Sequence, residues 1–228
     1  MWIVKLGGSL AHDERLAHWL HMLAELGGGR VLVVPGGAAF ADAVRAAQAR
    51  WRFDDLTAHN MAVLAMAQTA HLLHALEPRL VLVSEEQDIL RAQHAGQAGL
   101  WMPLTLLRDA PDMLTSWDVT SDSIALWLAR RLNAERLVVV KACAVVPPHS
   151  FAKLSAIGLV DRRFAQWASD ASFPIEVVAC DDLARVQDAL LGGASLAAPG
   201  TPTPAQGTAS GSSRSKGAGP RPRRKPIK

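Results

Sequence analysis

A lysine close to a pair of glycines, in Lys5-Leu6-Gly7-Gly8-Ser9, supplies residue types that bind anions. Adjacent glycines let backbone N–H groups approach an anion without an obstructing Cβ atom, and the lysine would place a cation beside it. A helix beginning directly afterwards would add the partial positive charge of its N-terminus. The alternative is a tight strand-to-helix turn with a surface lysine, and for this segment alone we favour that interpretation.

A second glycine pair follows another apolar run, in Val34-Pro35-Gly36-Gly37-Ala38. If both runs are strands of one parallel sheet, both glycine pairs can lie at the edge where open α/β sheets bind ligands. A simple turn remains the alternative for each pair. Two such turns, each after an apolar strand, nevertheless make an anion site the favoured prediction.

The segment Thr120-Ser121-Asp122-Ser123 has residue types that begin helices, because each can accept a hydrogen bond from a free backbone N–H group. Taken alone, helix capping is the favoured interpretation. The functional alternative is that Asp122 orients lysines or a metal ion while Thr120 or Ser121 contacts a substrate.

The elements that would position these residues alternate between strands and helices. Short apolar runs predict strands over 2–6, 30–34, 80–83, 136–141 and 175–179. Periodicity and end signals predict helices over about 13–26, 39–50, 55–76, 85–94, 121–132, 161–168 and 182–191. Residues 100–107 are ambiguous, and 142–158 show no clear period. This alternation predicts an α/β fold with a mostly parallel sheet covered by helices on both faces.

Composition separates a folded body from a basic tail. The chain has 228 residues, of which 50% are hydrophobic, and no apolar run reaches the roughly 20 residues of a membrane span. Residues 202–228 hold seven basic residues and no acidic one, which leaves 17 basic against 21 acidic residues, a formal charge of −4, for the rest. We therefore predict one domain over 1–201 and a disordered Pro/Gly/Ser-rich tail over 202–228. The acidic body gives no reason to expect nucleic-acid binding, except through the tail.

Other conspicuous residues receive plainer interpretations. Two cysteines, Cys143 and Cys180, cannot form a disulfide scaffold, and without a recognisable secretory signal we expect a cytoplasmic protein. The histidines form no motif that predicts a metal site. An apolar stripe in the helix over 55–76 is either core or a dimer seam; it comprises Met61, Met66, Leu72, Leu73 and Leu76.

Taken together and in this order, Lys5-Leu6-Gly7-Gly8-Ser9-Leu10, Val34-Pro35-Gly36-Gly37 and Thr120-Ser121-Asp122-Ser123-Ile124-Ala125 resemble the amino acid kinase superfamily. That superfamily includes acetylglutamate, aspartate, uridylate and isopentenyl phosphate kinases. Ala58-His59-Asn60-Met61-Ala62 and the segment 117–129 resemble the branch that phosphorylates [5-(aminomethyl)furan-3-yl]methyl phosphate in methanofuran-type cofactor biosynthesis, together with its bacterial relatives. The resemblance covers roughly residues 1–201.

The resemblance implies a three-layer α/β/α sandwich that uses ATP and Mg²⁺, phosphorylates a small phosphate or carboxylate and forms a homodimer or larger homo-oligomer. It implies that Lys5 contacts the transferring phosphoryl group and that Asp122 holds the lysines in place, with Lys141 as the second catalytic lysine. Thr120 and Ser121 would contact the acceptor. Phosphate or nucleotide contacts would come from Gly7, Gly8, Ser9, Gly36 and Gly37.

The chain departs from the family after the strand over 136–141. Relatives carry a Thr-Asp-Val-x-Gly-like nucleotide loop there, whereas this chain has Lys141-Ala142-Cys143-Ala144-Val145-Val146-Pro147-Pro148. The first hypothesis remains an ATP-dependent kinase of a small anionic acceptor. The altered loop keeps a second hypothesis open, a non-catalytic protein that binds a small molecule or oxyanion on the same fold. A third is that the basic tail tethers the domain to a polyanion.

Overall fold

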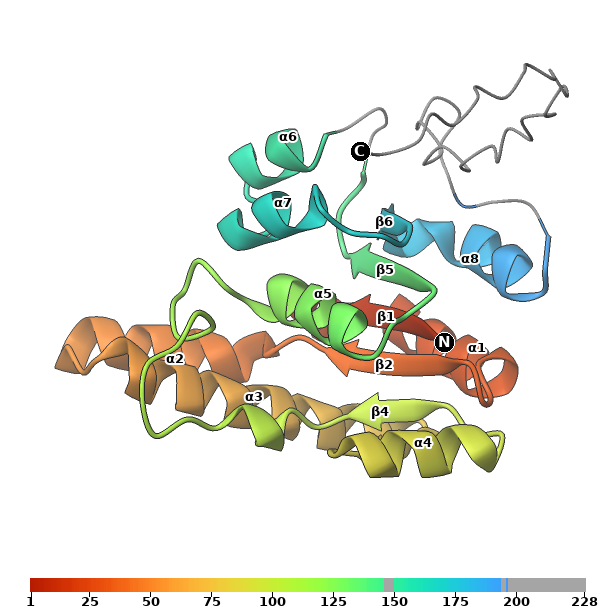
Figure 1. Ribbon diagram of the computed structural model, residues 1–228, viewed down its shortest axis with the longest axis horizontal. Coiled ribbons are helices and arrows are strands. Elements are labelled where there is room, and N and C mark those ends of the chain that lie inside the picture. Colours follow the sequence, from red (N-terminus) through yellow and green to blue (C-terminus); the bar gives the residue numbers. More distant parts are fainter. Residues whose placement is uncertain (146–149, 194–195, 197–228) are drawn as a thin grey trace, which may run out of the picture.

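Six parallel strands form a single sheet in the order β3-β4-β2-β1-β5-β6 (Figure 1). The computed structural model describes residues 1–145, 150–193 and 196. The predicted α/β fold is confirmed, and the sheet is entirely rather than mostly parallel. The predicted tail over 202–228, and the domain boundary before it, lie outside the described residues.

The elements follow one another as strand, helix and loop along the chain. The strands are β1 (Trp2–Leu6), β2 (Val31–Pro35), β3 (Val81–Val83), β4 (Gly99–Trp101), β5 (Arg136–Lys141) and β6 (Ile175–Ala179). The α-helices are α1 (Arg15–Leu26), α2 (Ala38–Trp51), α3 (Asp55–Leu76), α4 (Glu86–His94), α5 (Ser121–Arg131), α6 (Phe151–Ala156), α7 (Arg162–Ala168) and α8 (Leu183–Leu190). Short 3₁₀ helices occur at η1 (Gly8–His12), η2 (Leu104–Leu106) and η3 (Cys180–Asp182).

The sequence placed most elements to within two residues and missed three features. A 3₁₀ turn, η1, begins at Gly8 and ends at His12, and α1 begins only at Arg15, where we expected a helix from about residue 12 or 13. The ambiguous stretch 100–107 divides into β4 and η2. Helix α6 falls in the region without a clear period, where Ser150 caps a helix of six residues by accepting from Lys153 N at 3.3 Å.

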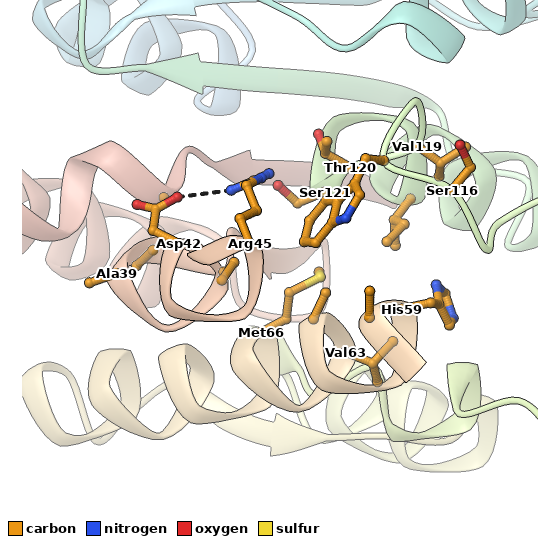
Figure 2. A pocket seen from close by; sticks show the side chains of 18 of the residues that line it. Ala39, Asp42, Arg45, His59, Val63, Met66, Ser116, Val119, Thr120 and Ser121 are labelled. Carbon is orange, nitrogen blue, oxygen red and sulfur yellow. Dashed lines mark hydrogen bonds and ion pairs between the residues drawn. The ribbon is translucent and has the colours of Figure 1, made fainter. Parts of the chain in front are cut away.

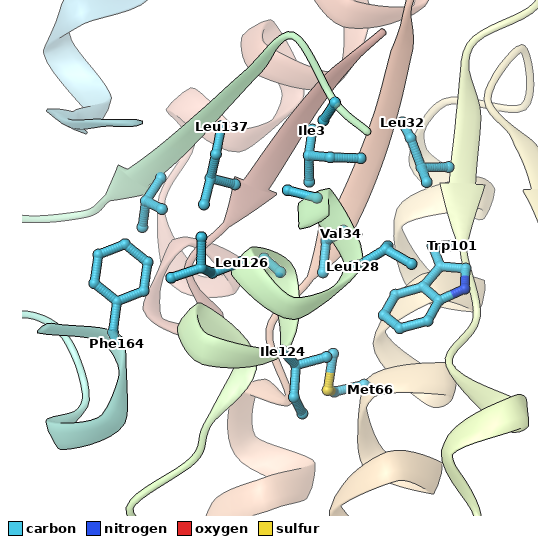
Figure 3. Close-up of a cluster of buried hydrophobic side chains, with 14 of the residues drawn as sticks. Ile3, Leu32, Val34, Met66, Trp101, Ile124, Leu126, Leu128, Leu137 and Phe164 are labelled. Carbon is cyan, nitrogen blue, oxygen red and sulfur yellow. The ribbon is translucent and has the colours of Figure 1, made fainter. Parts of the chain in front are cut away.

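Alternating strand residues feed two hydrophobic cores, one on each face of the sheet. On one face Ile3, Val34 and Leu137 pack against Leu126 of α5 and Phe164 of α7 (Figure 3). On the other face, residues such as Val4 and Val138 pack against α1 and α8. Helices therefore cover both faces, which gives the three-layer α/β/α sandwich that the resemblance implied.

Strand β1 lies where the strand order reverses direction. It pairs with β2 on one side and with β5 on the other, in registers that place Lys5 beside Val34 and Val139. In open parallel sheets, ligands bind beyond the carboxyl ends of strands at this point of reversal. Both glycine pairs and Lys141 lie there. Among the helices that the structure describes, none has both the length and the apolar character needed to cross a membrane.

Candidate active site

Two lysines from neighbouring strands share one buried carboxylate at this sheet edge. The Nζ atom of Lys5, in β1, lies 2.7 Å from Oδ1 of Asp122, and Nζ of Lys141, at the end of β5, lies 2.7 Å from Oδ2. Asp122 and Lys5 are 4% and 3% exposed. Because β1 is a central strand, Lys5 is neither an edge residue nor a surface lysine, which corrects the plainer interpretation of the first motif. The three residues together carry one net positive charge when both lysines are protonated.

The pKa values of this cluster follow from its burial and its charges. Burial acts to raise the pKa of Asp122, but Lys5 and Lys141 together outweigh it and hold that pKa below its ordinary value. Burial, reinforced by the charge of Lys5, lowers the pKa of Lys141 to about 8, while Asp122 acts in the opposite direction. Asp122 is therefore an anion at neutral pH, and Lys141 loses its charge as the pH rises through about 8.

Asp122 is not the cap of α5, although the sequence favoured that interpretation. The N-cap position belongs to Thr120, and the carboxylate of Asp122, in the first turn, is directed to the two lysines. The backbone N–H groups of Thr120 and Ser123 donate instead to Asp161, at 2.9 and 3.0 Å. The functional alternative for Asp122, an organiser of lysines, is therefore what its contacts favour.

The two glycine turns pack against each other, and this contact explains two of the glycines. A Cβ atom on Gly36 would lie 2.4 Å from Gly8 N, and one on Gly8 would lie 2.7 Å from Ala38 N. The turns are joined further by a hydrogen bond from Gly36 N to Leu6 O at 2.9 Å. Neither glycine is among the residues with positive φ, whereas Ala38, at the start of α2, has a φ of 47°. Close backbone approach, rather than a left-handed conformation, is thus the local reason for Gly8 and Gly36.

A cavity of about 380 Å³ opens beside the turns, between α2, α3 and the start of α5 (Figure 2). It brings together the predicted residues Gly8, Ser9, Gly37, Thr120 and Ser121. Its apolar lining comes mainly from α3, with Ala58, Ala62, Val63 and Met66, and is extended by Val119 in the loop before α5 and by Ile124 of α5. Gly7, Gly36, Lys5, Asp122 and Lys141 are not among its lining residues; Asp122 lies in the first turn of α5, and the other four lie at the adjoining strand ends. The predicted site residues therefore divide between the charged cluster and the cavity.

The rim of the cavity carries charged and aromatic residues that the sequence analysis did not single out. The guanidinium of Arg45 lies 4.3 Å from the ring centre of Trp117 and donates to Asp42 at 2.8 Å. The Trp117 ring donates through Nε1 to Gln48 Oε1 at 2.5 Å, and Gln48 donates to Asp55 Oδ1 at 2.9 Å. These contacts join α2, the loop before α5 and the first turn of α3.

His59 is a further lining residue, on the cavity side of α3. It is 8% exposed, and its Nε2 atom is 2.9 Å from Leu106 O, so Nε2 carries the proton as the donor. The next residue, Asn60, donates to Arg108 O at 2.8 Å and accepts from Arg108 N at 2.9 Å. The predicted Ala58–Ala62 segment therefore joins α3 to the loop around Leu106 and Arg108.

Only part of the apolar stripe of α3 belongs to the core. Met66 and Leu73 are buried, whereas Met61, Leu72 and Leu76 are 36%, 40% and 53% exposed.

Within the described residues, no group of three or more His, Cys, Asp and Glu side chains is arranged to hold a metal ion. Lysines and backbone N–H groups are ligands for the phosphates of a nucleotide, and the cluster supplies the lysines. In the two turns, however, Gly7 N and Gly36 N already donate to Val140 O and Leu6 O, at 3.0 and 2.9 Å, so their predicted phosphate contacts are left to Gly8 and Gly37.

Comparison with known proteins agrees with this arrangement. The sequence profile of the Amino acid kinase family matches residues 1–146. The [5-(aminomethyl)furan-3-yl]methyl phosphate kinase of Methanocaldococcus jannaschii is 25% identical over 140 residues, which are 61% of this chain and 64% of that relative. The match thus spans just under two thirds of the relative's length.

Solved structures share the fold at lower sequence identity. Uridylate kinase from Archaeoglobus fulgidus superposes with a TM-score of 0.62 at 14% identity, covering 85% of this chain and 97% of that structure. UMP kinase from Ureaplasma parvum gives 0.59 at 14% identity, covering 83% and 94%, and an isopentenyl phosphate kinase gives 0.58 at 14%, covering 85% and 97%. Since the family profile covers more than half of the sequence and the fold agrees, this chain belongs to the amino acid kinase family.

Proposed function

We propose that this protein is an ATP-dependent phosphotransferase acting on a small anionic acceptor. The observation that carries the proposal is the buried Lys5–Asp122–Lys141 cluster, beside two glycine turns and an adjoining cavity. Phosphoryl transfer requires mainly in-line positioning and neutralisation of charge on the equatorial oxygens. Two lysines held by one carboxylate provide a fixed cation that does not have to reorganise during the reaction.

We assign one role to the lysines at the strand ends and another to the residues that line the cavity. Lys5 and Lys141 would contact phosphoryl oxygens on the side of the β1 and β5 strand ends. Backbone N–H groups of Gly8 and Gly37, with Ser9, would hold phosphate oxygens next to the cavity, where Thr120 and Ser121 would meet the acceptor. An acceptor that is already a phosphate or carboxylate anion requires no general base.

ATP would supply the transferable phosphoryl group, and Mg²⁺ would neutralise part of its charge. Mg²⁺ usually keeps several waters and binds through substrate phosphates with one or two carboxylates. We therefore propose that it arrives with the nucleotide rather than in a protein cage. The segment after Lys141 lacks the family's acidic residue and glycine, so Lys141 would take a larger share of the nucleotide's phosphate contacts.

For the acceptor we propose [5-(aminomethyl)furan-3-yl]methyl phosphate or a compound of the same class, with a cation, a flat ring and a phosphate. The relative from Methanocaldococcus jannaschii is named for this substrate. The cavity offers matching chemistry: an apolar floor with Met66 and Val119, an indole at Trp117, and charges of both signs on the rim. Asp55 keeps acceptor capacity for an ammonium group after accepting from Gln48, and Arg45 keeps donors for an anion after pairing with Asp42.

The proposal is tested by ATP consumption with a panel of acceptors and mass analysis of the product. The panel contains the aminomethyl furan phosphate, its analogue without the amine, other phosphates and carboxylates. We expect Asp55→Asn to raise KM about tenfold or more for the amine-bearing acceptor and to change it little for the analogue. Asp54→Asn is the matched control, since Asp54 caps α3 by accepting from Thr57 N at 2.7 Å. Tight binding of ATP or acceptor without turnover would favour the non-catalytic alternative.

We also propose a cytoplasmic homodimer that buries the exposed side of α3. Met61, Leu64, Leu72 and Leu76 lie on that side and are 36% to 53% exposed. Light scattering of the wild type and of Leu64→Glu tests this assembly. The expected result is a dimer that becomes a monomer in the variant, and a monomeric wild type would refute it.

A further inference from the structure

Asp161, the residue before α7, accepts five hydrogen bonds with one carboxylate. Oδ2 accepts from Thr120 N at 2.9 Å, Thr120 Oγ1 at 2.8 Å and Ser123 N at 3.0 Å. Oδ1 accepts from Ser123 Oγ and, at 2.8 Å, from Phe164 N. The last of these bonds caps α7, and the other four come from the beginning of α5. One carboxylate thus satisfies the N-terminal N–H groups of two helices.

The first turn of α5, whose N–H groups donate to Asp161, also contains Asp122, which contacts both lysines. Asp122 lies between the two residues that donate to Asp161, and Ser123 is completely buried. Thr120 and Ser121, in the same turn, line the cavity. A second bond, from Arg163 N to Asp118 O at 3.1 Å, ties α7 to the loop that leads into α5. The place of Asp122, and with it the distances to Lys5 and Lys141, therefore depends on α7.

We propose that Asp161 is a positioning residue for phosphoryl transfer, which clamps the first turn of α5 so that Asp122 keeps both lysines in place. The proposal rests on the proposed kinase function. Asp161 also links the charged cluster to the cavity. It lies in the segment that follows β5, the strand of Lys141, and it accepts from Thr120, which lines the cavity. Displacement of the first turn of α5 would disturb the lysines and the cavity wall together.

Asp161→Asn separates the clamp from the cap of α7. Asn is as good an N-cap as Asp, so the bond from Phe164 N survives. Its NH₂ group is a donor, however, and would face the backbone N–H groups of Thr120 and Ser123, which are donors as well. We expect kcat to fall about tenfold or more, with less than a threefold change in KM for ATP. A kcat within threefold of the wild-type value would overturn the proposal.

Two further variants distinguish positioning from general stability. Asp54→Asn makes the same chemical change at the N-cap of α3 and is expected to keep wild-type kcat. Ser123→Ala keeps Asp161 and its charge but removes the hydroxyl donor from α5, and should give a smaller loss of kcat in the same direction. If Asp161→Asn lowered the melting temperature while kcat of the folded enzyme stayed unchanged, Asp161 would be a structural cap alone.

A readout that needs no acceptor keeps this test separate from the proposed function. Lys141 faces Lys5 from β1, Asp122 from α5 and Asp161 from the start of α7, so its pKa reports the position of Asp122. The chain has six lysines, so the side-chain NMR signal of Lys141 can be assigned with Lys141→Arg. We expect the pKa of Lys141 to fall in Ser123→Ala, where the charge of Asp161 is kept, because Asp122 moves away.

The two possible failures then have different signatures. Absence of phosphoryl transfer by the wild-type protein with every acceptor would reject the proposed function, and the Lys141 titration alone would then decide on Asp161. An unchanged Lys141 pKa in Ser123→Ala would overturn the positioning role, whether or not the wild type is a kinase, because a fall of that pKa in Asp161→Asn alone reports only the lost charge of Asp161.

Discussion

Lys141 donates to Oδ2 of Asp122 at 2.7 Å, although the lysine ends a central strand and the aspartate begins a helix packed on one face of the sheet. Both side chains are largely buried, with 12% and 5% exposure. Lys5 holds the other carboxylate oxygen. The contact therefore joins two layers of the sandwich through charge.

Asp122→Asn is expected to lose turnover and stability together. Removing the shared anion leaves two buried lysines without their counter-charge, which costs roughly 3 kcal/mol when a buried pair is broken. Turnover should fall about 100-fold or more, because the cations lose their fixed positions. Steady-state kinetics and chemical denaturation measure the two effects. Capping alone would have predicted no change in either, so wild-type values in both would return Asp122 to that role.

Lys5→Met is expected to abolish most activity while the protein remains folded. Methionine fills much of the volume of this 3% exposed side chain, whereas alanine would leave a hole between β2 and β5. Loss of one cation from the phosphoryl path should lower kcat about 100-fold or more. Circular dichroism and kinetics on the same sample provide the check. Turnover near the wild-type level would remove Lys5 from the catalytic residues.

The pH dependence of ATP binding should follow Lys141. Its pKa of about 8 means that the folded protein loses this cation as pH rises through 8, so affinity for ATP should decrease above that pH. Between about 8 and the ordinary value of 10.5 the unfolded chain binds more protons, so Lys141 makes the free energy of unfolding rise with pH in this window. Calorimetry from pH 7 to 9.5 tests the first statement. Lys141→Arg should flatten the dependence, since arginine stays charged.

Alanine substitutions in the glycine turns should follow the order of their steric conflicts. The nearest backbone atom would lie 2.4 Å from a Cβ atom added to Gly36, 2.7 Å from one added to Gly8 and 3.0 Å from one added to Gly7. We expect Gly36→Ala to destabilise most, by about 1–3 kcal/mol, and Gly7→Ala least. Denaturation curves give the ranking. Equal stability of all three variants would show that the two turns separate easily.

Ala38→Gly is expected to leave stability unchanged or to raise it. The φ of 47° at Ala38 is strained for a residue with a Cβ atom, by about 1–2 kcal/mol. The greater freedom of glycine in the unfolded chain offsets about 0.4–1 kcal/mol of that relief. Ala46→Gly, at an exposed position of the same helix, should instead lose about 1 kcal/mol. Comparable losses in both variants would argue against strain at Ala38.

The sequence by itself determined the order of the elements and the chemistry at the strand ends. A strand made of continuous Leu and Val residues exposes apolar side chains on both faces, so helices must cover both of them. This pattern in β5 therefore indicated a buried parallel sheet. In such a sheet the carboxyl ends meet at one edge, which is why Gly7-Gly8 and Gly36-Gly37 could be placed together. The order of the three motifs indicated the family, and the resemblance pointed to Lys5, Asp122 and Lys141.

Only the tertiary structure decided how those residues are used. Capping a helix and holding lysines require the same residue types at the start of a helix, so the sequence could not separate the two roles of Asp122. In the structure Asp161, 39 positions further along the chain, accepts from the backbone of α5, and Asp122 contacts the lysines instead. The rim residues Arg45 and Trp117 have no spacing relation, since one lies in α2 and the other in a loop. Contacts between distant segments depend on how helices pack over the sheet. Local patterns in the sequence carry no record of that packing.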